Sequence, residues 1–81
     1  MRVRVRLFAR LRELGGSGEF VRDVPDGATV SSVWQSLVED FPGFADYRPS
    51  LSCAVNAEYA KFTTAVADGD EVAFMPPVSG G

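Results

Sequence analysis

Polar and apolar residues alternate strictly over residues 2–8, which read Arg-Val-Arg-Val-Arg-Leu-Phe. Because successive side chains of a β-strand point to opposite faces, this alternation predicts a strand with Val3, Val5 and Leu7 on its buried face. The three arginines then lie on the opposite face, which the pattern assigns to solvent. Phe8 shares that face, so the pattern places an aromatic side chain toward water.

Apolar residues in the middle of the chain recur at the spacing of one helical stripe, at Val30, Val33, Trp34, Leu37, Val38 and Phe41. Thr29 is suited to cap the first turn of this predicted helix. Pro42 and Gly43 are suited to end it, because proline cannot continue a helix and glycine tolerates the exit geometry. Trp34 lies on the stripe and is therefore expected in the core.

The remaining segments are shorter. Further strands are predicted over residues 19–24, 51–56, 59–62 and 71–75, with turns between them at residues 15–18, 25–27 and 68–70. Residues 9–14 favour a helix but are too short to hold one alone. Residues 44–50 are expected to form an irregular connection.

The order of these elements is two strands, one amphipathic helix, and two or three strands. A single amphipathic helix needs one apolar sheet face to cover. The order therefore predicts an α+β roll, the β-grasp or ubiquitin-like fold, in which one main helix covers a mixed sheet of four to five strands. Residues 1–75 are expected to form this domain, and residues 76–81 an extended C-terminal tail.

Composition narrows the chemistry that this domain can perform. A chain of 81 residues allows one small domain with a modest core. The sequence contains no histidine, so it cannot build a Ser-His or Cys-His nucleophile pair or a histidine metal site. Its one cysteine, Cys53, falls on the apolar side of a strand and is interpreted as an inert buried side chain. No metal site is expected.

The formal net charge is −3, which does not attract nucleic acid to the molecule as a whole. The arginines of the first strand are accordingly interpreted as a solvated face. No apolar run approaches the roughly 20 residues of a membrane span, and the N-terminal alternation lacks the apolar stretch of a signal peptide. We therefore expect a cytoplasmic domain with neither a nucleic-acid nor a membrane partner.

Two loop sequences resemble ligand sites only superficially. Gly15-Gly16-Ser17-Gly18 lacks the Gly-Lys-Ser/Thr of a phosphate-binding loop and the spacing of a dinucleotide fingerprint. Asp68-Gly69-Asp70 lacks the spacing of a calcium-binding EF-hand loop. Both are interpreted as turns, and no bound cofactor is expected.

The sequence ends in Pro76-Pro77-Val78-Ser79-Gly80-Gly81. Prolines cannot donate to a strand ladder, so they are expected to end the last strand and to stiffen the base of the tail. Glycines have no Cβ and can enter a channel too narrow for other residues. The tail is therefore interpreted as a device that presents the C-terminal carboxylate at a distance from the folded body.

Three segments carry recognisable motifs: residues 7–14 (Leu-Phe-Ala-Arg-Leu-Arg-Glu-Leu), residues 54–56 (Ala-Val-Asn) and, most specifically, residues 68–81 (Asp-Gly-Asp-Glu-Val-Ala-Phe-Met-Pro-Pro-Val-Ser-Gly-Gly). In these segments the chain resembles the family of small, sulfur-carrier subunits of molybdopterin synthase, and the likeness covers nearly the whole chain. Two departures are mild. Met75 stands where an aromatic residue is common, and the loop at residues 15–18 is rich in glycine.

The resemblance implies a sulfur carrier in molybdenum cofactor (molybdopterin) biosynthesis. An E1-like adenylyltransferase would use ATP to adenylate the carboxylate of Gly81, and a sulfur donor enzyme would convert the acyl adenylate to a thiocarboxylate. The sulfur would then pass to cyclic pyranopterin monophosphate within the synthase complex. The chain itself would have no catalytic residues beyond its C-terminal carboxylate, because the partner supplies the acids, bases and cationic anchors.

The resemblance also implies a partner, the large subunit of molybdopterin synthase, in a heterotetramer of two small and two large chains. The tail would enter the partner's channel through Pro77, Val78, Ser79, Gly80 and Gly81. The residues expected to bind the partner are Phe8, Tyr59, Met75 and Pro76, because exposed aromatic residues and methionine are enriched at interfaces. The alternative for Phe8 is that its ring packs under the loop at residues 9–18.

Other functions stay open at this point. The chain could carry sulfur for thiamine or for tRNA thiolation, because the chemistry at the carboxylate would be shared and only the acceptor enzyme would differ. It could also be a ubiquitin-like modifier that is joined to lysines of target proteins. A plain interaction module would leave the Gly80-Gly81 ending unexplained.

Overall fold

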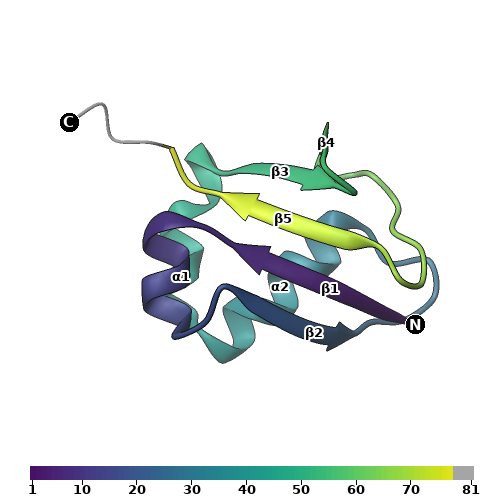
Figure 1. Cartoon of the computed structure of the whole chain (residues 1–81), viewed down its shortest axis with the longest axis horizontal. Helices are drawn as coiled ribbons and strands as arrows, with labels where there is room; N and C mark the ends of the chain where they lie inside the picture. The colour runs from purple at the N-terminus through teal and green to yellow at the C-terminus, as the bar shows by residue number, and fades with distance from the viewer. Residues whose placement is uncertain (78–81) are drawn as a thin grey trace.

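The computed structural model describes residues 1–77 and leaves residues 78–81 outside the described part of the chain. The elements in chain order are β1 (Arg2–Leu7), α1 (Ala9–Gly15), β2 (Glu19–Asp23), α2 (Val30–Asp40), the 3-10 helix η1 (Pro42–Ser50), β3 (Ser52–Val55), β4 (Glu58–Ala60) and β5 (Glu71–Met75). The strands form one five-stranded sheet in the order β2-β1-β5-β3-β4 (Figure 1). β1 is parallel to β5 and antiparallel to β2, and β3 is antiparallel to both β5 and β4.

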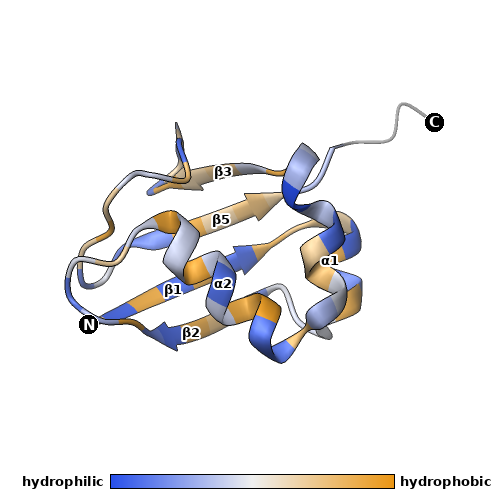
Figure 2. Ribbon diagram, turned by 180° about the vertical axis from the view of Figure 1, so that it is seen from behind, coloured by the Kyte–Doolittle hydropathy of each residue, from blue (hydrophilic) through white to orange (hydrophobic). Residues whose placement is uncertain are grey.

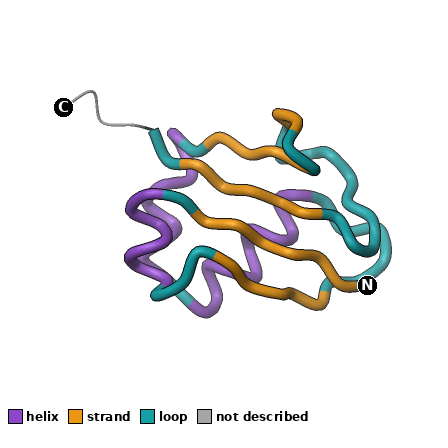
Figure 3. Tube along the Cα trace, in the orientation of Figure 1, coloured by secondary structure: helices purple, strands orange, loops and turns teal. Residues whose placement is uncertain are grey.

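The long helix α2 crosses one face of this sheet. It lies behind the strands in Figure 1 and in front of them in Figure 2, which is seen from the opposite side. Figure 3 shows the helical segments behind and beside the strands. We call the face under α2 the inner face and the opposite one the outer face. A mixed sheet covered by one main helix is the α+β β-grasp architecture, so the predicted fold is confirmed.

The inner face of the two central strands forms the middle of the core. Along β1, exposed and buried residues alternate as the sequence predicts, and Val3 and Val5 are completely buried. The parallel register places Val5 beside Val72 and Leu7 beside Phe74, so the two strands present one continuous apolar surface to α2. Burial on this scale is the main source of stability for a small domain.

The helix α2 covers that surface with its predicted stripe. Its buried residues are Val30, Val33, Trp34 and Leu37. The ring of Trp34 lies 5.0 Å from that of Phe74, centroid to centroid, which confirms its place in the core. Thr29 caps the helix as predicted: its hydroxyl accepts a hydrogen bond from the Ser32 N–H, and the Ser32 hydroxyl accepts one from the Thr29 N–H.

The segment after β1 forms a complete short helix, α1, where the sequence predicts only a helical tendency. Tertiary packing explains the difference, because Leu11 is completely buried and anchors the helix to the core. Gly16 caps the C-terminal end of the helix, and its φ of 77° is the left-handed geometry that favours glycine. An isolated helix of this length is unstable in water, so its stability comes from the core that it covers.

The connection predicted to be irregular at residues 44–50 is also helical, and this prediction was wrong. The 3-10 helix η1 begins at Pro42, and its Phe44 is completely buried. The Phe44 ring stacks between those of Trp34 and Phe41, with centroid separations of 5.6 Å and 5.0 Å. One aromatic anchor therefore orders a segment whose sequence shows no periodic apolar pattern.

The β3–β4 hairpin is tight, and its edge strand β4 is shorter than the sequence predicts. Its two-residue turn consists of Asn56 and Ala57, whose φ angles of 49° and 69° are both positive, as in a type I′ turn. β4 ends at Ala60 and not at Phe62, because a hydrogen-bonded turn begins at Lys61: the Thr64 N–H donates to its carbonyl at 3.0 Å. The short edge strand limits the exposed backbone available for pairing with other chains.

Candidate functional site

Within residues 1–77, no helix covers the outer face of the sheet (Figure 1). The strand registers assign its side chains: Glu19, Val21 and Asp23 on β2, Arg2, Arg4 and Arg6 on β1, Glu71, Ala73 and Met75 on β5, Ser52 and Ala54 on β3, and Tyr59 on β4. Apart from Val21, the outer-face residues of β2 and β1 are charged, and apart from Ser52, those of β3, β4 and the end of β5 are apolar. The outer face is therefore divided into a charged half and an apolar half.

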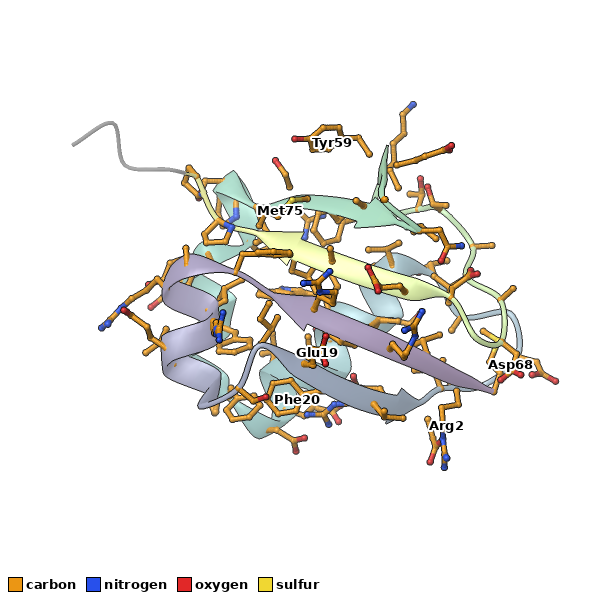
Figure 4. The ribbon with its side chains drawn as sticks, viewed as in Figure 1. Arg2, Glu19, Phe20, Tyr59, Asp68 and Met75 are labelled. Carbon is orange, nitrogen blue, oxygen red and sulfur yellow. The ribbon has the colours of Figure 1, made fainter. Side chains whose placement is uncertain are left out.

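The apolar half, together with the neighbouring ring of Phe8, forms a surface that we call the apolar patch: Phe8, Ala54, Tyr59, Ala73 and Met75. Tyr59 lies opposite Ala54, which in turn lies opposite Ala73, so two small side chains form a low floor beside the tyrosine. Tyr59 is 83% exposed. Figure 4 shows Met75 at the end of β5 and Tyr59 beyond β3 on the same side of the molecule.

Phe8 completes the patch at its central edge. It follows Leu7 as Met75 follows Phe74, and because Leu7 and Phe74 are paired in parallel register, Phe8 and Met75 leave neighbouring strands side by side. The Phe8 ring is 38% exposed and is not buried under the loop at residues 9–18. The Cζ atom of Arg6 lies 5.3 Å from the ring centroid. The expectation that Phe8 lies on the solvent face is thus confirmed, while its role in partner binding remains a prediction.

The base of the tail adjoins this patch. β5 ends at Met75, as the double proline predicts. Pro76 is buried, unlike the other three residues expected to bind a partner. Pro77, which follows it, is exposed. The remaining tail residues, Val78, Ser79, Gly80 and Gly81, lie outside the described residues. The chain therefore leaves the body next to Met75, at the edge of the apolar patch.

The charged half of the outer face is internally paired. Arg2 lies 3.0 Å from Asp23, and Arg4 lies 3.8 Å from Glu71, measured between nitrogen and oxygen atoms. Arg6 is shared between Glu19 and Glu71, at 3.8 Å from each. The hydrogen bond from Arg2 lowers the pKa of the Asp23 carboxyl. Arginines already paired with carboxylates are poor phosphate ligands, which agrees with the predicted solvated face.

The far end of the sheet carries a hydrogen-bond network and no ligand geometry. The carboxylate of Asp70 accepts bonds from the Ala67 N–H at 2.7 Å and the Asn56 side-chain amide at 2.9 Å, and both bonds lower its pKa. Asn56 in turn accepts a bond from the Glu71 N–H at 3.0 Å. Residues 68–70 thus form a turn that is joined to the β3–β4 hairpin by hydrogen bonds, which is a structural role.

Two further features of the described chain bear on chemistry. Cys53 is buried, its thiol donates to the Ala60 carbonyl at 3.1 Å, and burial raises its pKa, so it is held as a neutral thiol. Among residues 1–77, no group of three or more His, Cys, Asp or Glu side chains could hold a metal ion. None of the helices in the same part of the chain is both long enough and apolar enough to cross a membrane.

Sequence reasoning missed Arg6 and the two alanines as parts of this site. The alternation places Arg6 and Phe8 two residues apart on one strand face, which is a signal for contact between them. Ala54 and Ala73 gave no signal, because only the strand register brings them together between Tyr59 and Arg6.

Comparison with known proteins shows which family and which individual proteins the chain is similar to. A model of the ThiS family matches residues 5–81. The molybdopterin synthase sulfur carrier subunit of Arabidopsis thaliana is 38% identical over 79 residues, which cover 98% of this chain and 82% of that protein. The protein of the same name from Escherichia coli is 39% identical over 83 residues, which cover 98% of this chain and 99% of that protein.

Among solved structures, small archaeal modifier protein 1 from Haloferax volcanii has a TM-score of 0.88 and 34% sequence identity, with 100% of both chains covered. The similarities therefore extend over the whole length of the chain and include two kinds of protein, sulfur carrier subunits and a small modifier.

Proposed function

The chain belongs to the ThiS family, and from this premise we propose that it is the sulfur carrier subunit of a molybdopterin synthase. The single observation that carries this proposal is the likeness over the full chain to proteins of that name, together with a ThiS-family match that runs to residue 81. The described body supports it with an apolar patch beside the base of the tail. A body that offers a docking surface and a chain end, and no histidine, suits a carrier whose chemistry is performed by other proteins.

The proposed chemistry takes place at the carboxylate of Gly81. A carboxylate is a poor electrophile, so it first attacks ATP on an E1-like adenylyltransferase, which gives an acyl adenylate and pyrophosphate. A persulfide sulfur of the donor enzyme then attacks the acyl carbon and expels AMP. A thiol cleaves the resulting acyl disulfide and leaves a thiocarboxylate, whose sulfur is the nucleophile delivered to cyclic pyranopterin monophosphate.

The proposed partner surface is the apolar patch, and its occupant is the large subunit of the synthase. Aromatic side chains and methionine are enriched at interfaces, and Phe8, Tyr59 and Met75 supply them here. Pro76 is buried, so its contribution is to fix the direction in which Pro77 leaves the body. Docking at the apolar patch would bring the tail to the partner's active site, because the base of the tail adjoins the patch.

The test is loading of the terminus by purified components. Incubation with the adenylyltransferase of the same organism, ATP and a persulfide donor should raise the intact mass by the difference between one sulfur and one oxygen atom. The matched control is the chain without Gly81, which should keep its fold and gain no mass. An unchanged mass for the complete chain, under conditions that load the Escherichia coli carrier, would contradict the proposal.

A second candidate function is conjugation to other proteins, and the likeness to a small archaeal modifier favours it specifically. The same acyl adenylate could be attacked by a lysine amine of a target, which would form an isopeptide bond and release AMP. Peptides that carry a Gly-Gly remnant on lysine, found in cell extract and absent when Gly81 is deleted, would support this function. If these peptides are absent from an extract in which the thiocarboxylate is found, the result would support sulfur transfer and contradict conjugation.

A further inference from the structure

We propose that Arg6 is a positioning residue for partner docking, because its guanidinium holds the ring of Phe8 in place at the boundary between the charged half and the apolar patch. The inference rests on the proposed function, since it concerns binding of the synthase large subunit. It adds a residue that belongs to neither the tail nor the apolar patch.

The contacts of Arg6 point in three directions. Its Cζ atom lies 5.3 Å from the centroid of the Phe8 ring, within the range of a cation–π interaction. Its Nε atom lies 3.8 Å from a Glu19 oxygen on one neighbouring strand, and another guanidinium nitrogen lies 3.8 Å from a Glu71 oxygen on the other. The guanidinium is therefore held from both sides while it contacts the ring.

The backbone and the neighbouring strand also bear on the position of the Phe8 ring. Phe8 is the N-cap residue of α1, and its backbone is still extended. The register places Ala73, which has a small side chain, opposite Arg6. On the backbone side, Ala9 has a φ of 51°, which turns the chain sharply into α1 directly after Phe8. The backbone turn determines the direction in which the Phe8 side chain leaves the chain, and the contact with Arg6 restrains the orientation of its ring.

Arg4 provides a matched comparison on the same strand. It lies two residues before Arg6 on the outer face, is also exposed (65% against 44% for Arg6), and also pairs with Glu71 at 3.8 Å. Among residues 1–77, the arginines that contact aromatic rings are Arg6, Arg22 and Arg48. Replacing Arg4 therefore removes an equal charge from the same face without removing a contact to Phe8.

A ring held in its bound position costs less to order on docking. A cation–π contact at an exposed site should thus change the partner affinity by about two- to fivefold. The effect should pass through Phe8, so it should vanish when the ring is absent. A direct contact between Arg6 and the partner would instead persist without the ring.

The experiment measures the dissociation constant of the chain for the large subunit of the same organism by isothermal titration calorimetry. We expect Arg6→Met to weaken binding by about two- to fivefold, Arg6→Lys to restore part of the loss, and Arg4→Met to leave the affinity unchanged. In the Phe8→Leu background, Arg6→Met should cause no further loss. Thermal unfolding of each variant checks that the body remains folded.

A second readout uses the free protein. The side-chain proton resonances of Arg6 should be shifted by the ring current of Phe8 and should return to ordinary positions in Phe8→Leu. The inference is overturned if Arg6→Met binds as the wild type does, if Arg4→Met weakens binding equally, or if the loss persists in Phe8→Leu. A wild-type chain that does not bind the large subunit at all would overturn the proposed function together with the role of Arg6.

Discussion

Two residues of the β3–β4 turn show how backbone strain is distributed at the scale of single residues. Asn56 and Ala57 both adopt positive φ angles, of 49° and 69°. Asparagine gains a local compensation there, because its side chain accepts a bond from the Glu71 N–H and donates one to Asp70. Alanine gains none, and in this conformation its Cβ crowds the following carbonyl. Ala57 is therefore a strained position.

The first prediction relieves this strain. Ala57→Gly should raise the free energy of unfolding by about 1 kcal/mol, because glycine is favoured at the second position of a type I′ turn. Urea denaturation followed by circular dichroism measures the change. The control is Ala60→Gly in β4, which should lower stability because glycine weakens a strand. A drop in stability for Ala57→Gly would show that the turn is not strained.

Phe8 and Phe44 are the same type of residue in opposite environments. Phe44 is completely buried between two other rings, so Phe44→Ala should cost roughly 3–5 kcal/mol of stability. Phe8 lies at the surface, and the second prediction is that Phe8→Arg weakens binding to the large subunit by about tenfold or more while the unfolding temperature stays close to that of the wild type. Calorimetry of binding and thermal melts check the two parts. A melt lowered as far as in Phe44→Ala would place Phe8 in the core.

At the scale of elements, the sequence predicts those whose periodicity is uninterrupted. β1 and α2 follow from strict alternation and from a stripe of six apolar positions. α1 and η1 could not be predicted with the same success, because each is anchored by a single buried residue, Leu11 or Phe44, and one buried position gives no periodic pattern. The end of β4 was misplaced because the turn at Lys61 carries neither glycine nor proline.

The network between the β3–β4 turn and the start of β5 gives the third prediction, which concerns pH. Its centre, Asp70, has a pKa below the ordinary 3.8 because its charged form accepts bonds from Ala67 and Asn56. A carboxyl whose pKa is lowered by folding stabilises the native state above its unfolded pKa, and this contribution is lost as the pH falls through the folded pKa. The stability difference between the wild type and Asp70→Asn should therefore be present near pH 7 and should shrink below about pH 4.

Urea titrations of both proteins at several pH values measure that difference. Asp46→Asn is a suitable control, because Asp46 is exposed and forms no ion pair among residues 1–77. A difference between wild type and Asp70→Asn that stays constant down to pH 2–3, roughly the lower end of ordinary carboxyl titration, would contradict the assignment.

At the scale of the whole molecule, the outer face is organised along its length. The apolar patch and the base of the tail share one end, and the hydrogen-bonded turns with Asp68 and Asp70 occupy the other, as the separation of Met75 and Asp68 in Figure 4 shows. The sequence predicts that Phe8 and Met75 both take part in partner binding. It could not predict the alanine floor or the contact of Arg6 with the ring, because both depend on how distant strands align.

This organisation makes docking and delivery separable, which gives the fourth prediction. A chain that ends at Pro77 keeps the whole described body and should still bind the large subunit, although it has no terminus to load. It should therefore compete with the loaded carrier and inhibit sulfur transfer in a reconstituted synthase. Adding Phe8→Arg to this truncated chain should abolish the inhibition. Inhibition that survives the substitution would place the docking surface elsewhere.

The buried thiol of Cys53 has a practical consequence for a molecule that would hold a reactive sulfur at its end. With its pKa raised and its sulfur bonded to the Ala60 carbonyl, the thiol should react slowly with an alkylating reagent such as iodoacetamide while the protein is native. A thiocarboxylate at Gly81 would react readily. A brief treatment of the folded chain should then attach one label to each molecule that carries a thiocarboxylate and none to a molecule without it. The number of labels per chain therefore measures the fraction of the carrier that is loaded with sulfur.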